Sequence, residues 1–126
     1  MKVLWLDDEG RRVSVYSDAL GLCDHEVKVV GTLKQFRERL QEGGVQVVLI
    51  DVMLPTGQFD LVQTDYGSKT GLIIAREVQT TYPGIRVILF TNHHDTRHMA
   101  EMSGLTVLSK MEMSPWDLNK ILEELA

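Results

Sequence analysis

Short, almost continuously apolar runs recur along this chain, and each is followed by a segment whose apolar residues have helical spacing. The runs occupy residues 3–6, 27–30, 45–50, 85–90 and 105–108, and they are rich in Val, Ile and Leu. Runs of this length and branching are typical of strands that are buried on both faces of a sheet. The pattern therefore restricts the chain to alternating buried strands and helices.

The segments between the runs carry the start and stop signals of helices. Thr32 and Thr70 are residues that can cap a helix N-terminus, and Ser114 is followed by Pro115 and by an acid three residues on. In the last helix we expect Trp116 to be buried with the apolar residues that follow it. The predicted helices occupy residues 11–20, 33–42, 71–82, 94–103 and 115–126.

Five strands alternating with five helices predict a (βα)5 fold. Right-handed crossovers between the strands give a parallel sheet with helices on both faces. A closed barrel needs eight such units. We therefore predict a five-stranded, doubly wound parallel sheet of the flavodoxin-like kind, with strand order 2-1-3-4-5. The length of 126 residues predicts one domain, residues 1–126.

Composition excludes several classes of protein. The formal net charge of −5 supplies no electrostatic footprint for nucleic acid, so no nucleic-acid partner is expected. No apolar run approaches the ~20 residues of a membrane span, and the N-terminus does not resemble a signal peptide. The single cysteine, Cys23, cannot form an internal disulfide, which fits a cytoplasmic location.

Polar residues follow four of the five apolar runs. They are Asp7 and Asp8 after the first run, Asp51 after the third, Thr91 after the fourth and Lys110 after the fifth. Ligands of open α/β sheets bind outside the carboxyl ends of the strands, so these side chains are expected to form one cluster. Carboxylate oxygens suit Mg²⁺, and a nucleophilic carboxylate beside a cation and a hydroxyl suits phosphoryl transfer.

Four motifs in this order resemble the receiver domain of two-component response regulators, of the single-domain chemotaxis type. Residues 3–9, Val-Leu-Trp-Leu-Asp-Asp-Glu, resemble the family's first strand and its acid pair. Residues 47–55, Val-Val-Leu-Ile-Asp-Val-Met-Leu-Pro, resemble its phosphoacceptor strand. Thr91 and Lys110 match the family's Thr and Lys at the ends of the last two strands.

The resemblance implies a role for each of these residues. Asp51 is the implied phosphoacceptor, and Mg²⁺ is implied to bind Asp7, Asp8, Asp51 and the backbone carbonyl of Met53. Thr91 is implied to donate to a phosphoryl oxygen, and Lys110 to pair with the phosphoryl group.

The resemblance also implies signal relay. Phosphate is expected to arrive from a histidine kinase or a phosphotransfer protein and to change a surface that binds a downstream protein. The fourth helix, the fifth strand and the last helix are the first candidates for that surface. The chain is then a phosphoacceptor that catalyses its own phosphorylation and dephosphorylation, and not an enzyme with a free substrate. The start at Met1 and the absence of a linker after Ala126 lead us to expect a single-domain receiver and not a fragment of a larger regulator.

Three single positions depart from the family pattern. Val107 stands where the family usually has a switch aromatic, so another element must move if the chain switches. Met111 replaces the usual proline after the lysine, and we expect a trans bond there because a non-proline cis bond costs ~3 kcal/mol. Asn92 is larger than the family's small residue and would narrow access to the site.

Residues 56–69 form the largest departure, because this connection is about a dozen residues shorter in typical receivers. Connections beyond ~12–15 residues are uncommon in compact domains and are usually functional or disordered. One hypothesis is a lid or docking loop anchored by Phe59, Leu61 and Tyr66. The alternative is a self-packed surface loop without a role.

Other functions fit less well. A receiver-like adaptor that binds partners without phosphorylation is the main alternative. A phosphatase of the haloacid dehalogenase type needs a second acid where Met53 stands, and a flavodoxin's phosphate would be repelled by residues 7–9. His94 and His98 have helical metal-ligand spacing, but a solvated helix face is favoured. Four methionines are expected to fill the core, with an adaptable binding surface as the alternative: Met99, Met102, Met111 and Met113.

Overall fold

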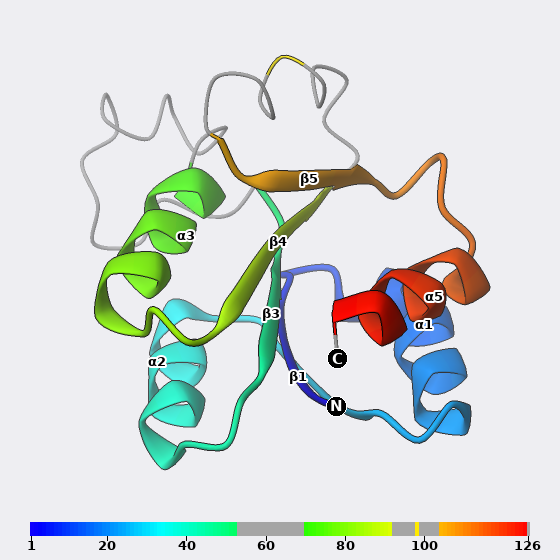
Figure 1. The fold of residues 1–126 in the computed structure, drawn as a ribbon, viewed down its shortest axis with the longest axis horizontal. Helices are drawn as coiled ribbons and strands as arrows, with labels where there is room; N and C mark the ends of the chain where they lie inside the picture. Colours follow the sequence, from blue (N-terminus) through cyan, green and yellow to red (C-terminus); the bar gives the residue numbers. More distant parts are fainter. Residues whose placement is uncertain (53–69, 92–97, 99–103, 126) are drawn as a thin grey trace.

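The computed structural model describes residues 1–52, 70–91, 98 and 104–125, and its centre is a five-stranded sheet (Figure 1). The strand order is β2-β1-β3-β4-β5, and all neighbouring strands are parallel. This confirms the predicted fold class and strand order. The strands are β1 (Lys2–Leu6), β2 (Glu26–Val30), β3 (Val47–Ile50), β4 (Arg86–Thr91) and β5 (Thr106–Ser109).

Four of the predicted helices are present, with ends within two residues of the expected ones. The helix after β3 begins at Thr70 itself and not after it, a one-residue difference that is ordinary at helix ends. The predicted helix at 94–103 lies outside the described residues apart from His98, which is exposed. The helices are α1 (Gly10–Leu22), α2 (Leu33–Glu42), α3 (Thr70–Thr81) and α5 (Pro115–Leu125).

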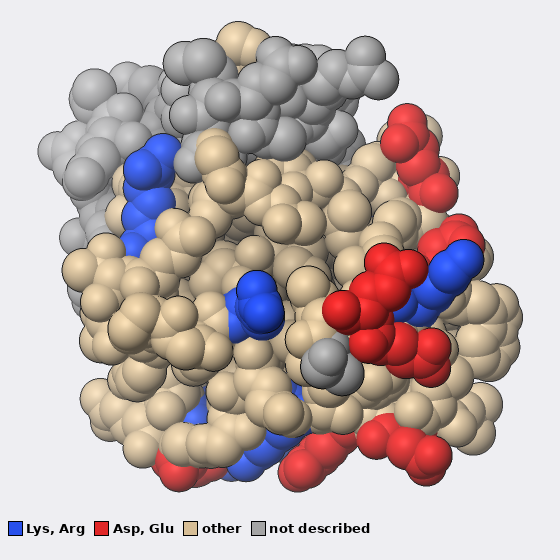
Figure 2. All heavy atoms as spheres, in the orientation of Figure 1, with Lys and Arg blue, Asp and Glu red and all other residues tan. Residues whose placement is uncertain are grey.

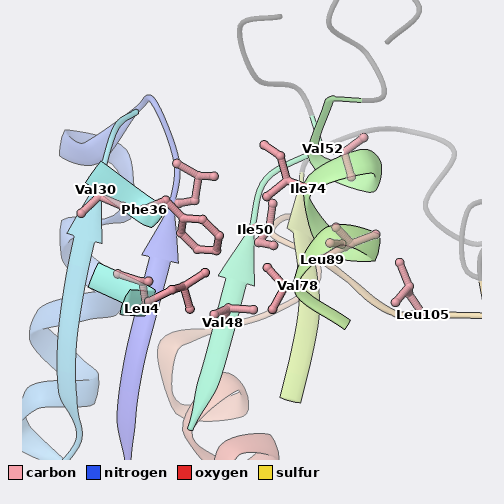
Figure 3. Close-up of a cluster of buried hydrophobic side chains, with 13 residues drawn as sticks. Leu4, Val30, Phe36, Val48, Ile50, Val52, Ile74, Val78, Leu89 and Leu105 are labelled. Carbon is pink, nitrogen blue, oxygen red and sulfur yellow. The ribbon is translucent and has the colours of Figure 1, made fainter. Parts of the chain in front are cut away.

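Helices cover both faces of the sheet, with α2 and α3 on one face and α1 and α5 on the other (Figure 1). Alternate side chains of each strand point to opposite faces, so each central strand contributes to two cores. Leu4 and Leu6 of β1 join the core under α2 and α3, whereas Val3 and Trp5 join the one under α1 and α5. Figure 3 shows the first of these cores, in which Phe36 and Ile74 come from the helices.

The helix starts follow the sequence signals at Thr32 and Ser114. The backbone N–H of Gln35 donates to the Thr32 hydroxyl at 3.2 Å. At α5 the N–H of Asp117 donates to the Ser114 hydroxyl at 3.1 Å, and the N–H of Ser114 donates to the Asp117 carboxylate at 3.0 Å. These two reciprocal bonds form a capping box, which fixes where α5 begins.

The expected burial of Trp116 is wrong, because 59% of this residue is exposed. Each helical residue advances by about 100°, so Trp116 lies about 200° from Leu118. Leu118 and Leu122 are fully buried and define the inner face of α5. Trp116 therefore lies on the outer face, where its ring contacts solvent.

The surface around α5 is rich in acidic side chains, which gather on the side of α1 and α5 in Figure 2. Asp117, Glu123 and Glu124 are exposed.

Two of the four methionines that were expected to fill the core lie among the described residues. Met113 packs against the core, but Met111 is 82% exposed and does not fill it. Met99 and Met102 lie outside the described residues. Among the described helices, none is long and apolar enough to span a bilayer.

Candidate functional site

Backbone hydrogen bonds of the sheet continue past the strand ends into three of the predicted site residues. The N–H of Asp7 donates to the Val30 carbonyl at 3.0 Å, and the N–H of Asp51 donates to the Leu6 carbonyl at 3.0 Å. The N–H of Lys110 donates to the Thr91 carbonyl at 2.9 Å. The main chain of the site is therefore held by the same ladder as the sheet.

The side chains at these strand ends converge on Asp51. The Thr91 hydroxyl donates to Asp51 Oδ1 at 2.8 Å, and Lys110 Nζ lies 3.4 Å from Asp51 Oδ2. Lys110 Nζ also donates to Asp7 Oδ2 at 2.5 Å. The side chains of Asp7, Asp51 and Lys110 are 0%, 8% and 8% exposed, so these charge-assisted bonds are poorly screened by solvent.

Three carboxylates meet in this cluster. Asp7, Asp8 and Asp51 each offer an oxygen, and the three oxygens lie within 4.8 Å of one another. Asp7 and Asp51 are buried, whereas Asp8 is exposed. Three ionised carboxylates and one ammonium leave an excess of negative charge that a hard divalent cation can offset, and carboxylate oxygens are the ligands that such a cation prefers.

Two opposing effects act on the pKa of the Lys110 ammonium. Burial lowers its pKa, but the hydrogen bond to Asp7 and the charges of Asp51 and Asp7 outweigh that effect. The pKa of Lys110 therefore lies above its ordinary value of 10.5. The group carries its positive charge throughout the neutral range, as a partner for anionic oxygens must.

Gly71 contributes to the site in a way that the sequence did not reveal. A Cβ at this position would lie 2.0 Å from the Asp51 carbonyl oxygen and 2.6 Å from the Val52 Cα. The first turn of α3 thus packs directly on the backbone that follows β3, and the N–H of Gly71 donates to the Val52 carbonyl at 3.1 Å. The only sequence signal for this close approach is a glycine in the first turn of the predicted helix.

The structure brings together five of the six predicted site residues: Asp7, Asp8, Asp51, Thr91 and Lys110. Met53, the expected carbonyl ligand, lies outside the described residues, as do Asn92 and the proposed lid at 56–69. Val107 is half-buried and packs against the core under α2 and α3. No peptide bond among the described residues is cis, so the expected trans bond before Met111 is confirmed.

No protein-family model matches the chain, and no curated protein matches it in sequence. Solved structures do match. A response regulator receiver domain protein from Clostridium thermocellum is 22% identical, with a TM-score of 0.75 over 98% of this chain and 92% of that chain. Chemotaxis protein CheY4 of Vibrio cholerae is 21% identical, with a TM-score of 0.75 over 99% of this chain and 98% of that one.

A third match is the response regulator TrrA of Thermotoga maritima, whose structure is a complex with Mg²⁺ and BeF. It is 17% identical, with a TM-score of 0.75 over 99% of this chain and 98% of that chain. All three likenesses extend over nearly the whole of both chains. The chain therefore has the fold of the response regulator receiver domains.

Proposed function

We propose that the chain is a phospho-accepting receiver of a two-component system, with Asp51 as the phosphoacceptor. The observation that carries this proposal is the setting of the Asp51 carboxylate. It lies between the Thr91 hydroxyl at 2.8 Å and the Lys110 ammonium at 3.4 Å, with Asp7 and Asp8 close by. A carboxylate with these neighbours has both a nucleophilic oxygen and donors for the oxygens of a transferring phosphoryl group.

In the proposed reaction an Asp51 oxygen attacks the phosphorus of a phosphohistidine on the donor protein. A P–O bond forms, the P–N bond breaks, and the imidazole keeps the bonding electron pair and takes up a proton from solvent. Thr91 and Lys110 turn their donors from the carboxylate to the phosphoryl oxygens. In the later dephosphorylation, water attacks phosphorus, the P–O bond to Asp51 breaks, and inorganic phosphate leaves. The chain catalyses both steps on itself and has no other substrate.

The donor set fits Mg²⁺. Asp7, Asp8 and Asp51 supply hard oxygen ligands, and Asp8 is exposed to solvent. Bound Mg²⁺ supplies charge neutralisation for the phosphoryl oxygens. The complex of TrrA with Mg²⁺ and BeF supports this choice of cation, since TrrA has the same fold.

The proposed partners are a histidine kinase or phosphotransfer protein, which delivers the phosphoryl group, and a downstream protein, which responds to it; the proposed location of the chain itself is the cytoplasm. The half-buried β5 and the outer side of α5 with exposed Trp116 belong to the face that we assign to the downstream protein. An aromatic side chain exposed in this way is a common anchor of protein interfaces.

Intact mass spectrometry after incubation with a small acyl-phosphate donor tests the proposal. Wild-type protein should gain one phosphoryl group in Mg²⁺ and none in EDTA, and Asp51→Asn should gain none in either. Asp18→Asn is the matched control, because Asp18 is an exposed carboxylate in α1, and it should be phosphorylated like wild type. A folded, Mg²⁺-saturated wild-type chain that gains no mass would favour either the phosphorylation-independent adaptor or a connection at 56–69 that shuts out small donors. The same measurement with residues 59–68 deleted separates the two, and no gain of mass in that variant either contradicts the proposal.

A further inference from the structure

Tyr16 links α1 to the segment that carries Lys110. Its hydroxyl lies 3.1 Å from the Lys110 carbonyl oxygen and 3.0 Å from the Met113 carbonyl oxygen, so it shares its proton between them. Its ring packs edge-on against Phe90, with ring centroids 5.3 Å apart, and against Trp5, with centroids 6.0 Å apart. The ring is thus fixed by core packing, and the hydroxyl is aimed at the backbone after β5.

Both main-chain polar groups of Lys110 are tied to elements that carry other site residues. Its N–H donates to the carbonyl of Thr91 at the end of β4, and its carbonyl accepts from Tyr16 in α1, the helix that follows Asp7 and Asp8. The next residue, Met111, is 82% exposed, so its side chain adds little packing that would hold the turn. The Tyr16 hydroxyl therefore ties this turn to α1 through two of the turn's carbonyl groups.

We propose that Tyr16 is a positioning residue for Lys110. By holding the Lys110 carbonyl, its hydroxyl fixes the direction in which the side chain leaves the backbone, and so keeps Nζ between Asp7 and Asp51. This inference rests on the proposed function, because it gives Tyr16 a role in phosphoryl transfer. A tyrosine that only fills the core would act through its ring, and its hydroxyl would be dispensable for the reaction.

The first test is a double-mutant cycle of Tyr16→Phe and Lys110→Met, with the phosphorylation rate and the unfolding free energy measured for each variant. Tyr16→Phe keeps the ring and should slow phosphorylation by about two- to tenfold, the range that corresponds to one lost neutral hydrogen bond. In the Lys110→Met background it should have no further effect on the rate, because the side chain that it positions is absent. Tyr82→Phe, which removes a hydroxyl on the other face of the sheet, is the matched control and should keep the wild-type rate.

Two results of this cycle overturn the proposal. One is a wild-type rate in Tyr16→Phe. The other is an equal slowing by Tyr16→Phe with and without the Lys110 side chain, which would indicate a general loss of structure. A wild-type chain that accepts no phosphoryl group is a failure of the proposed function and not of the positioning role, so the latter needs a readout that is independent of the reaction.

Nitrogen-15 NMR of the Lys110 ammonium supplies that readout. In wild type the bonds to Asp7 and Asp51 and the burial of the side chain should slow the exchange of the ammonium protons with water enough for the signal to be resolved. In Tyr16→Phe the signal should broaden or shift, and in Tyr82→Phe it should stay. An unchanged Lys110 signal in Tyr16→Phe overturns the positioning role whether or not the chain is phosphorylated.

Discussion

At the scale of the residue, the close approach of Gly71 to Asp51 predicts a strong intolerance of a methyl group. In Gly71→Ala the new Cβ meets the Asp51 carbonyl oxygen at 2.0 Å, so α3 must shift away from the end of β3. Overpacking of this kind costs about 1–3 kcal/mol of unfolding free energy. Urea denaturation measures this loss, and a slower phosphorylation of Asp51 should accompany it.

Gly21→Ala is the control for this substitution. Gly21 lies in α1, and a Cβ there has no neighbour within 4 Å among the described residues. Alanine is a better helix former than glycine by up to about 1 kcal/mol, so Gly21→Ala should stabilise the protein or leave it unchanged. Equal effects of the two substitutions would contradict the contact between α3 and the backbone of Asp51 and Val52.

The site residues differ in how far the sequence reveals them. Asp7, Asp51, Thr91 and Lys110 were predictable because each lies within two residues of the end of an apolar run, and strand ends of a parallel sheet share one edge. The contacts of Gly71 and of Tyr16 were not. They are steric or hydrogen-bonded contacts to backbone, and that of Tyr16 spans 94 residues of chain, beyond any local pattern.

At the scale of the element, the capping box of α5 gives a pH dependence with a definite sign. The Ser114 backbone N–H and then the Ser114 hydroxyl hold the pKa of Asp117 below its ordinary value of 3.8. A lowered carboxyl pKa stabilises the folded state above the unfolded value, and the contribution is lost as the pH falls through the folded value. The unfolding free energy of wild type should therefore exceed that of Asp117→Ala at neutral pH, and the difference should shrink below pH 3.8.

Urea denaturation of both proteins across this range measures the difference. Glu124→Ala, which removes an exposed carboxylate from the last turn of the same helix, is the comparison. A difference between wild type and Asp117→Ala that stays constant as the pH falls would show that the Asp117 carboxylate does not cap α5.

Helix starts were predicted well where a side chain caps the first turn, as at Ser114 and Thr32. Burial of single residues was less predictable. Trp116 is apolar and lies in an amphipathic helix, yet its angle about the helix axis puts it outside. Near a helix start, an apolar residue is compatible with either face until the position of the inner stripe is known.

At the scale of the whole molecule, the proposed Mg²⁺ site would couple binding of the cation to folding, because its three carboxylates come together only in the folded chain. Mg²⁺ that binds only the folded state should raise the unfolding free energy by about 2.7 kcal/mol at a hundred times its Kd. In Asp8→Asn a tenfold weaker Kd would remove about 1.4 kcal/mol of that gain. In EDTA the same substitution should leave stability equal or higher, because it removes one of three mutually repelling carboxylates.

Thermal unfolding in Mg²⁺ and in EDTA checks whether Asp8→Asn lowers stability in the first condition but not in the second. Asp18→Asn is the control and should match wild type in both. If Mg²⁺ stabilises Asp8→Asn against thermal unfolding as much as it stabilises wild type, Asp8 is not a ligand of the cation. A loss of stability in EDTA would instead give Asp8 a structural role of its own.

The order of the site residues along the chain also separates the carboxylates from their hydrogen-bond donors. All three carboxylates lie before the turn that joins α3 to β4, and the hydroxyl and the ammonium lie after it. A chain cut in this turn would give two pieces, one with the acids and one with their donors, and neither would hold a complete site. Since β3 and β4 are neighbours in the sheet, their reassociation would restore the chemistry, and the protein would serve as a sensor of whether two tethered partners have met.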